Sequence, residues 1–231
     1  MPQIIPISLV DWRDNSSISL FFSGCNMNCM YCHNKHLIQK YKDIDMNKAK
    51  DEILKSKPFI NSVIFSGGEP TLHFNEIVEL SIFSKNHNLK VGIHSNGLDY
   101  HTINHLLKLN IIDKWFIDYK LADRNIYRIK DVLGINKNYA LMVLYTIRNI
   151  HGNNTPLEVR TTVFNKVHTP NDIKNIAQDL CMLVNEDIYY VIQQGNLNGD
   201  KVSMDKLKEY KKIANEYLSN VTIRTALGEE E

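Results

Sequence analysis

The sequence predicts an α/β fold in which parallel strands alternate with outer helices, arranged as a partial, open β/α barrel. Short β-branched and aromatic runs alternate with helix-like segments along the whole chain, and that alternation is typical of a parallel sheet with crossover helices. The 231 residues are somewhat few for a complete eightfold barrel. We therefore expect an open barrel of about six parallel strands.

Seven apolar runs rich in Val, Ile, Phe and Tyr are expected to form the strands. They cover residues 17–23, 62–66, 89–95, 114–121, 157–164, 188–194 and 220–225. Helix-like segments lie between them, and several begin with Asp, Asn, Thr or Ser, which favour the N-cap. These segments cover residues 45–56, 75–87, 100–110, 138–150, 169–184 and 203–219. The pattern predicts a single domain over residues 1–231, with a core over about 17–225 and a short lead-in over 1–16.

The charges of the chain are nearly balanced, with 27 Lys and Arg against 26 Asp and Glu. This balance gives no reason to expect a nucleic acid or an anionic membrane surface as a partner. The N-terminus lacks the basic leader and apolar run of a signal peptide, and no apolar stretch is long enough to span a bilayer. We therefore expect a cytoplasmic protein, whose thiols stay reduced.

Polar groups follow the predicted strands at the points where the strands end. In parallel α/β folds, ligands bind at the carboxyl ends of the strands. These polar groups should therefore converge on one rim and form the functional site. In chain order they are the cysteine loop 25–32, Gly67 to Pro70, Ser95 and Asn96, Asp118 and Lys120, Arg160, and Gln193 and Gln194.

Three of the four cysteines lie within eight positions, in the stretch SGCNMNCMYCHN at residues 23–34. Thiolates of Cys25, Cys29 and Cys32 can hold three irons of a [4Fe–4S] cluster, whereas ordinary electron-transfer clusters use four cysteines. A cluster with three protein ligands keeps one iron open to a substrate or cofactor. The same logic separates open catalytic zinc sites from closed structural ones.

Two other interpretations of the cysteine loop stay open on spacing alone. A zinc site would take His33 or His36 as its fourth ligand, although zinc motifs usually pair two short knuckles across a longer gap. A redox pair of Cys29 and Cys32 would leave Cys25 unexplained. The fourth cysteine, Cys181, has helical spacing with Leu180, Leu183 and Val184, and we expect it to be a buried small hydrophobe.

The pattern C-x3-C-x-aromatic-C, followed by GGEP after the next strand, resembles the radical S-adenosylmethionine superfamily. The segments ISLVDW, SGCNMNCMYCHN and FSGGEPTL resemble the activating proteins of anaerobic ribonucleoside-triphosphate reductase and the related pyruvate formate-lyase activating enzymes. SNG, IDYKL and VRTTV fall where that group carries its later strand-end motifs. The resemblance implies a barrel of the radical SAM type and two cofactors, a [4Fe–4S] cluster and S-adenosylmethionine.

The resemblance also implies an activity. One electron from the reduced cluster would cleave S-adenosylmethionine to methionine and a 5′-deoxyadenosyl radical, which would take a hydrogen from a glycine Cα of a partner. That partner would be a glycyl-radical enzyme, with anaerobic ribonucleotide reductase expected, and flavodoxin or ferredoxin would serve as the external electron donor. The alternatives are a radical enzyme acting on a small molecule, such as a deazapurine precursor, and a non-enzymatic zinc-binding module.

Roles for the rim residues follow from the resemblance. Tyr31 would lie beside the adenine, and Ser95 and Asn96 would bind the ribose hydroxyls. The segment 67–70 would meet the methionyl ammonium, with Glu69 either supplying the complementary charge or fixing the turn. As a bare pattern, GGEP is also typical of a strand-to-helix turn and SNG of a turn that ends a strand. His33 and Asn34 are expected to brace the cysteine loop.

The remaining rim residues carry opposite charges. Asp118 and Lys120 alternate with Tyr119 and so share a face of their strand. They are expected to pair with each other or with the methionine end of the cofactor. Arg160 would neutralise the cofactor carboxylate or form a structural salt bridge. The family often has an acidic residue and a threonine before this Asn-Gly, where His94 and Ser95 stand here, which puts a cation site built on that acid in doubt.

Overall fold

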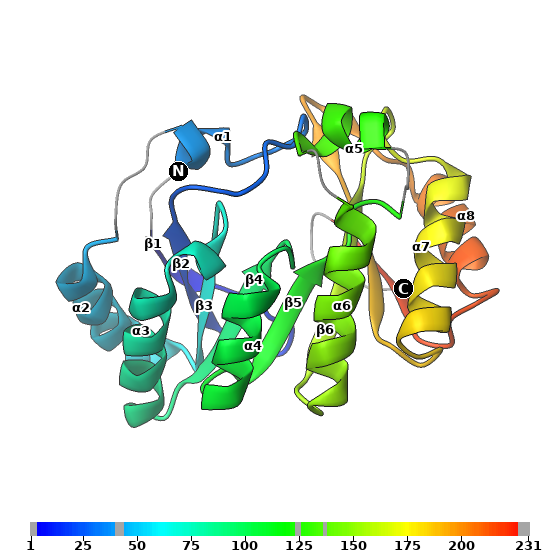
Figure 1. Ribbon diagram of the computed structural model, residues 1–231. Helices are drawn as coiled ribbons and strands as arrows, with labels where there is room; N and C mark the ends of the chain where they lie inside the picture. The colour runs from blue at the N-terminus through cyan, green and yellow to red at the C-terminus, as the bar shows by residue number, and fades with distance from the viewer. Residues whose placement is uncertain (1–3, 40–43, 123–125, 136–137, 226–231) are drawn as a thin grey trace. The chain divides into compact units, whose positions relative to one another are not determined.

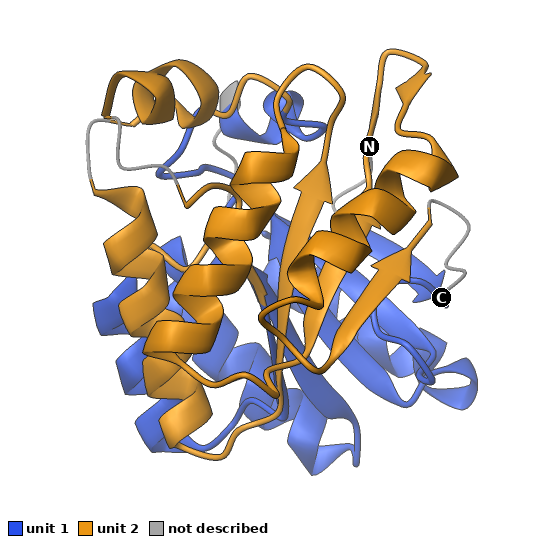
Figure 2. Cartoon of the chain, turned by 90° about the vertical axis from the view of Figure 1, so that its right-hand side faces the viewer, with its two compact units in different colours: residues 1–28, 32–95, 99–116 blue, residues 29–31, 96–98, 117–231 orange. Residues whose placement is uncertain are grey.

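The computed structural model describes residues 4–39, 44–122, 126–135 and 138–225. It has mainly parallel strands with helices packed outside them (Figure 1). The predicted α/β fold of parallel strands and outer helices is therefore confirmed. The chain forms two compact units, coloured separately in Figure 2. The first comprises residues 1–28, 32–95 and 99–116, and the second comprises residues 29–31, 96–98 and 117–231.

The first unit contains three neighbouring parallel strands. Strands β2 (Ser17–Phe22), β3 (Ser62–Gly67) and β4 (Lys90–Ser95) run parallel. Strand β1 (Ile4–Ser8) pairs antiparallel with β2 at the edge of the sheet. β1 falls within the predicted lead-in and was not expected. Its Pro6 has no amide hydrogen, and an edge strand tolerates that loss.

The predicted helices of this unit are present within a residue or two of their expected bounds. They are α2 (Met46–Ser56), α3 (Phe74–Asn86) and α4 (Tyr100–Leu109) (Figure 1). α2 and α4 begin where an aspartate side chain accepts a hydrogen bond from a backbone amide of the first turn, which satisfies a donor that the helix leaves open. α4 ends at Asn110, which has a left-handed φ of 51°. A short helix, α1 (Lys35–Gln39), follows the cysteine loop and was not predicted.

The segment ISLVDW is anchored to these strands by its last two residues. The Trp12 ring packs edge-on against Phe116, with 5.8 Å between ring centroids, and a Cβ added to Gly92 would lie 3.1 Å from Trp12. Asp11 accepts a hydrogen bond from the Ser19 hydroxyl at 2.5 Å, and its carbonyl accepts one from Nε2 of His94 at 3.0 Å. His94 therefore holds the N-terminal segment in place.

The second unit is built on three parallel strands, β6 (Leu157–Val163), β7 (Tyr190–Gln194) and β10 (Val221–Arg224). Strand β5 (Lys114–Asp118) begins in the first unit and ends in the second. The predicted helices are α6 (Tyr139–Gly152), α7 (Pro170–Leu183) and α8 (Met204–Ala214). Sequence patterning missed helix α5 (Ile126–Leu133) and the hairpin of β8 (Asn196–Leu197) and β9 (Asp200–Lys201).

Helix α7 has a strongly defined start. The Thr169 side chain accepts from the backbone of Asp172, and the Asp172 carboxylate accepts from the backbone of Thr169, which forms a capping box. The Arg128 guanidinium donates two hydrogen bonds to the same carboxylate, from Nη1 at 2.5 Å and from Nη2 at 2.8 Å. Burial alone would raise the pKa of Asp172, but the hydrogen bonds from Arg128 and Thr169 outweigh it and lower that pKa below its usual value.

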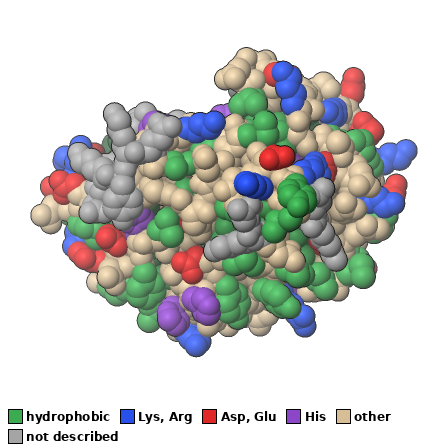
Figure 3. All heavy atoms as spheres, turned by 45° about the horizontal axis from the view of Figure 1, so that its top comes forward, with side chains coloured by type: hydrophobic (Ala, Val, Ile, Leu, Met, Phe, Trp, Pro, Cys, Tyr) green, Lys and Arg blue, Asp and Glu red, His purple; other side chains and the backbone are tan. Residues whose placement is uncertain are grey.

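The surface charge matches the nearly equal numbers of acidic and basic residues in the sequence. On the face shown in Figure 3, acidic and basic side chains are interspersed and neither sign forms a continuous patch. Among the described residues, no helix has both the length and the apolar character needed to cross a bilayer.

Candidate active site

The GGEP segment lies directly against the start of the cysteine loop. The amide of Gly68 donates to the carbonyl of Phe22, and the amide of Glu69 donates to the carbonyl of Gly24, both at 2.9 Å. Gly67 has a φ of +122°, and a Cβ added to Gly68 would overlap the carbonyl oxygen of Gly24. Both glycines are therefore required because their backbone touches that of residues 22–24. This requirement holds whether or not a ligand also approaches them.

This contact makes Gly68→Ala a test of loop placement. The added methyl group must push the Gly24 backbone away, next to Cys25, at a cost of about 1–3 kcal/mol. We expect less iron bound per chain after anaerobic reconstitution and a lower midpoint of urea unfolding. Gly152→Ala is the matched control, because no atom lies within 4 Å of a Cβ added there. Equal iron content in the two variants would show that the contact does not place the cysteine loop.

Glu69 is buried, with 1% of its surface exposed. Its Oε1 accepts hydrogen bonds from the Thr71 amide at 3.2 Å, the Thr71 hydroxyl at 2.7 Å and the Ser95 hydroxyl at 2.8 Å. The carboxylate thus caps the turn η2 (Pro70–Leu72) and ties it to the end of β4. Of the two predicted roles of Glu69, fixing the turn is present in the structure.

Further hydrogen bonds hold the two flanks of the cysteine loop within the first unit. Nε2 of His73 donates to the carbonyl of Ser23 at 2.7 Å, and the Gly24 amide donates to the carbonyl of Leu37 at 2.9 Å. Nδ2 of Asn34 donates to the carbonyl of Gly67 at 3.0 Å. Asn34 therefore braces the loop, as predicted, whereas the contribution of His73 was not anticipated.

Cys25 and Cys32 are half-buried and Cys29 is buried, and none of the three forms a disulfide with another described residue. Within the described ranges, no group of three or more His, Cys, Asp or Glu side chains is arranged to hold one metal ion. A [4Fe–4S] cluster makes a different demand, because each thiolate binds its own iron.

The middle of the cysteine loop belongs to the second unit. The Met30 amide donates to the carbonyl of Val132 at 2.9 Å, beside helix α5. The Tyr31 ring is buried against Phe164 and His168, with centroid distances of 4.6 and 6.1 Å. Tyr31 is therefore held by aromatic packing, which is compatible with its predicted place beside an adenine.

Asp118 and Lys120 form the predicted ion pair. Nζ of Lys120 lies 2.6 Å from Oδ2 of Asp118, and both side chains are partly buried. Burial alone would lower the pKa of Lys120, but the Asp118 carboxylate, followed by the nearby Tyr31 and Cys29, raises that pKa well above its ordinary value. The ammonium therefore stays charged at neutral pH, close to one cysteine of the loop.

The backbone around this ion pair is fixed on both sides. The Tyr139 hydroxyl donates to the carbonyl of Asp118 and accepts from the amide of Lys120, each at 2.8 Å. Burial raises the pKa of Tyr139 well above its usual value, so this hydroxyl keeps its proton. The amide of Tyr119 donates to the carbonyl of Arg160 at 2.8 Å. Tyr139 has no motif in the sequence that would have identified it.

Arg160 forms a buried salt bridge, one of the two roles considered for it. Its Nε lies 3.5 Å from Oε1 of Glu158, and Nη1 of Arg224 lies 2.6 Å from the same oxygen. Alternation along β6 places Glu158 and Arg160 on one face of the strand. A role of Arg160 toward the cofactor carboxylate remains a prediction.

The other predicted rim residues also have local partners. Oδ1 of Asn96 accepts from the Leu98 amide at 3.0 Å, which closes a turn. Gln193 accepts from the Thr162 hydroxyl at 3.1 Å, and Gln194 donates to the carbonyl of Val202 at 2.6 Å. These contacts shape the ends of the strands, and the ligand-binding roles of Ser95 and Asn96 stay predictions.

The expectation of a buried Cys181 was wrong. This cysteine is half-buried, although Leu180 beside it on α7 is fully buried. Successive helical residues point about 100° apart, so a neighbour of a core residue can lie at the edge of the buried stripe.

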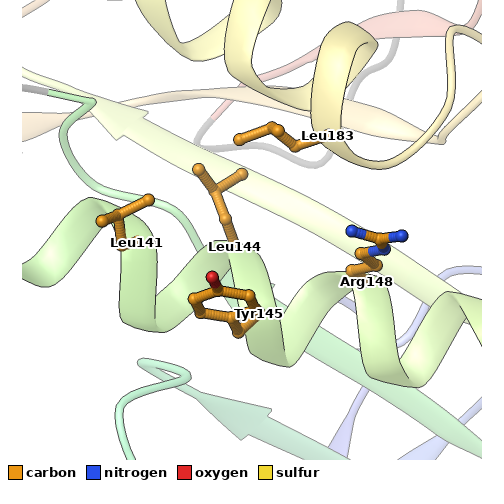
Figure 4. A pocket seen from close by; sticks show the side chains of 5 residues that line it. All are labelled: Leu141, Leu144, Tyr145, Arg148 and Leu183. Atoms are coloured by element: carbon orange, nitrogen blue, oxygen red, sulfur yellow. The ribbon is translucent and has the colours of Figure 1, made fainter.

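A separate hollow lies between α6 and α7 (Figure 4). Most of its lining is apolar, with one guanidinium group at the side. The lining residues are Leu141, Leu144, Tyr145, Arg148 and Leu183. None of them was predicted as a site residue.

Comparison with known proteins identifies the class to which this fold and cysteine loop belong. Residues 19–180 match the family model described as the radical SAM superfamily. The chain belongs to the radical SAM superfamily, and it is a radical SAM enzyme.

Individual relatives give a finer picture. A Methanocaldococcus jannaschii protein, provisionally named a glycyl-radical enzyme activating enzyme, is 31% identical over 97% of this chain and 95% of its own length. The 7-carboxy-7-deazaguanine synthase of the same organism is 26% identical over 88% of this chain and 86% of its own length. The crystal structure of a radical SAM methyltransferase from Sphaerobacter thermophilus superposes with a TM-score of 0.75 at 12% identity. It covers 93% of this chain and 67% of the methyltransferase, and at that identity it supports the fold alone.

Proposed function

We propose that this protein activates a glycyl-radical enzyme, and that its partner is an anaerobic ribonucleoside-triphosphate reductase. The observation that carries the proposal is the near full-length similarity to a relative with an activating-enzyme name, combined with the three-cysteine loop. The segments ISLVDW and SGCNMNCMYCHN resemble the activating proteins of this reductase and the related pyruvate formate-lyase activating enzymes, and they favour an activating enzyme over an enzyme that acts on a small molecule. When bound, the [4Fe–4S] cluster and S-adenosylmethionine would together supply a 5′-deoxyadenosyl radical.

The residues of the loop fit such a pair of cofactors. Three cysteines that form no disulfide among the described residues lie on one loop, and thiolates are the ligands that iron–sulfur clusters require. The charged Lys120 lies close to Cys29, where it would offset the negative charge of thiolate-ligated iron and of a cofactor carboxylate. Cys25, Cys29 and Cys32 would hold the cluster.

The remaining residues would bind and orient S-adenosylmethionine. Aromatic packing would position the adenine, hydroxyl and amide groups would hold the ribose, and charged groups would hold the methionine end. In that order the residues are Tyr31, then Ser95 and Asn96, then Gly67, Gly68, Glu69, Pro70, Asp118, Lys120 and Arg160.

Three further expectations belong to the same proposal. The electron would come from an external one-electron donor such as flavodoxin or ferredoxin. The protein would act in the cytoplasm, without a nucleic acid or a membrane as partner. Residues 1–231 would work as one radical SAM domain.

The test is the formation of a glycyl radical on the partner. We expect a glycyl-type doublet in electron paramagnetic resonance when the reduced protein, S-adenosylmethionine and an anaerobic ribonucleotide reductase are mixed without oxygen. Replacing the radical glycine of the partner by alanine should remove the doublet without stopping all uncoupled cleavage of S-adenosylmethionine. A doublet that forms only with another glycyl-radical enzyme would overturn the choice of partner, and the absence of any doublet would overturn the activating function.

The similarity to 7-carboxy-7-deazaguanine synthase favours one second candidate, a radical enzyme acting on a deazapurine precursor. In that case a small molecule would be consumed and no doublet would form on any glycyl-radical enzyme. Product analysis by mass spectrometry, run beside the resonance measurement, separates the two functions.

A further inference from the structure

His168 belongs to the second unit and contacts both the Tyr31 ring of the cysteine loop and the backbone of Lys120, which pairs with Asp118. The residue is 1% exposed. Both of its ring nitrogens are used, because Nε2 lies 3.0 Å from the carbonyl of Lys120 and Nδ1 accepts from the amide of Phe164 at 3.1 Å. A ring nitrogen that meets a carbonyl must donate, so the imidazole is fixed in one neutral tautomer.

The same ring also contacts the aromatic residue of the cysteine loop. The centroids of His168 and Tyr31 lie 6.1 Å apart, and Phe164 packs on Tyr31 at 4.6 Å. His168 therefore has three kinds of contact at once: with the Lys120 backbone, with the Phe164 backbone and with the Tyr31 ring.

The backbone of His168 is itself held rigidly. Its carbonyl accepts from the Tyr210 hydroxyl at 2.7 Å, and the next residue, Thr169, begins α7 with the capping box. Burial lowers the pKa of His168 to about 4, although its hydrogen bond to Lys120 and the nearby Asp172 carboxylate act in the opposite direction. The ring therefore stays neutral across the physiological range and cannot switch its hydrogen bonds.

We propose that His168 is a positioning residue that keeps the Tyr31 end of the cysteine loop in register with the Asp118–Lys120 ion pair. This inference rests on the proposed function, in which Tyr31 meets the adenosyl end of S-adenosylmethionine and the ion pair meets the methionine end. A ligand held at both ends binds tightly only when its two subsites stay at a fixed separation. His168 provides that connection within the second unit, which contains both Tyr31 and the Asp118–Lys120 ion pair.

The experiment compares the whole cofactor with its two halves. Anaerobically reconstituted His168→Phe would keep an aromatic ring but lose both hydrogen bonds, while His168→Gln can replace the donor to Lys120. Binding of S-adenosylmethionine, methionine and 5′-deoxyadenosine is measured by calorimetric competition. We expect His168→Phe to weaken S-adenosylmethionine roughly tenfold or more, and each half less than about threefold. His168→Gln should recover part of the loss.

Leu180→Ala is the matched control, because it removes a fully buried side chain of α7 without touching His168. It should lower the melting temperature and leave the ratio of whole-cofactor to half-cofactor affinity unchanged. Equal weakening of the cofactor and both halves in His168→Phe, or no weakening at all, would overturn the positioning role. If His168→Phe does not fold, His168→Gln carries the same comparison. Failure of the wild-type protein to bind S-adenosylmethionine would instead overturn the proposed function.

Discussion

Replacing any one of Cys25, Cys29 and Cys32 by alanine is expected to abolish reductive cleavage of S-adenosylmethionine. Each thiolate would ligate a different iron of the cluster, so no neighbouring side chain can substitute for a missing one. Cys181→Ala should leave cleavage nearly intact, because that residue lies on α7 and has no part in the loop. The measurement is production of 5′-deoxyadenosine by protein reconstituted with iron and sulfide and reduced with dithionite.

Iron and sulfide content and the visible spectrum accompany this measurement. Wild-type protein should be brown and sensitive to oxygen, and the three loop variants should lose most of that colour. A variant lacking all three loop cysteines that still makes 5′-deoxyadenosine would refute the cluster assignment. Colourless wild-type protein with tightly bound zinc would instead support the zinc alternative.

The strands and most helices could be predicted because their local sequence agrees with their final burial. β3, for example, contains Val63, Ile64 and Phe65, which are fully buried. Helix α7 begins at a Thr–Pro pair, with Asp172 at the third helical position. Such segments carry their own start and stop signals. Local pattern and tertiary environment point to the same structure there.

The missed elements lack that agreement. β1 contains Pro6 and pairs through one edge only, so a proline that argues against a strand is tolerated. α5 has only eight residues, which is short for a clear helical period. The β8–β9 hairpin has two residues in each strand, and its turn at Asn198 and Gly199 is the only strong local signal.

Some residues of the candidate site could be predicted from sequence motifs, whereas others are recognised only by their tertiary contacts. Cys25, Gly68 and Glu69 could be found from the sequence because their spacing is tied to one another along the chain. His168, Tyr139 and Glu158 could not, since each contacts a residue many positions away through a hydrogen bond or an ion pair. Their respective partners are Lys120, Asp118 and Arg224. A lone buried histidine or tyrosine carries no periodic or spacing signal, so only the folded arrangement shows its partners.

Substitutions of Glu69 distinguish most clearly between two roles of the GGEP segment, forming a turn and binding the cofactor. Glu69→Gln keeps an acceptor at the Oε1 position for Thr71 and Ser95, so the turn should survive and stability should change by less than about 1 kcal/mol. If the carboxylate meets the ammonium of S-adenosylmethionine, losing its charge should weaken cofactor affinity by roughly 1.5–3 kcal/mol. Glu69→Ala should weaken affinity and also destabilise the fold, because buried donors lose their acceptor at about 1–3 kcal/mol each.

Cofactor affinity must be compared at equal iron content, and unfolding by urea measured on the same preparations. Glu209→Gln, at an exposed position within α8, makes the same change of charge outside the predicted site and should behave like the wild type in both measurements. The informative comparison is Glu69→Gln against the wild type, because the turn is intact in both. Unchanged affinity in that variant would mean that GGEP acts only as a turn. The methionine end of the cofactor would then be held by the remaining charged candidates, which are Asp118, Lys120 and Arg160.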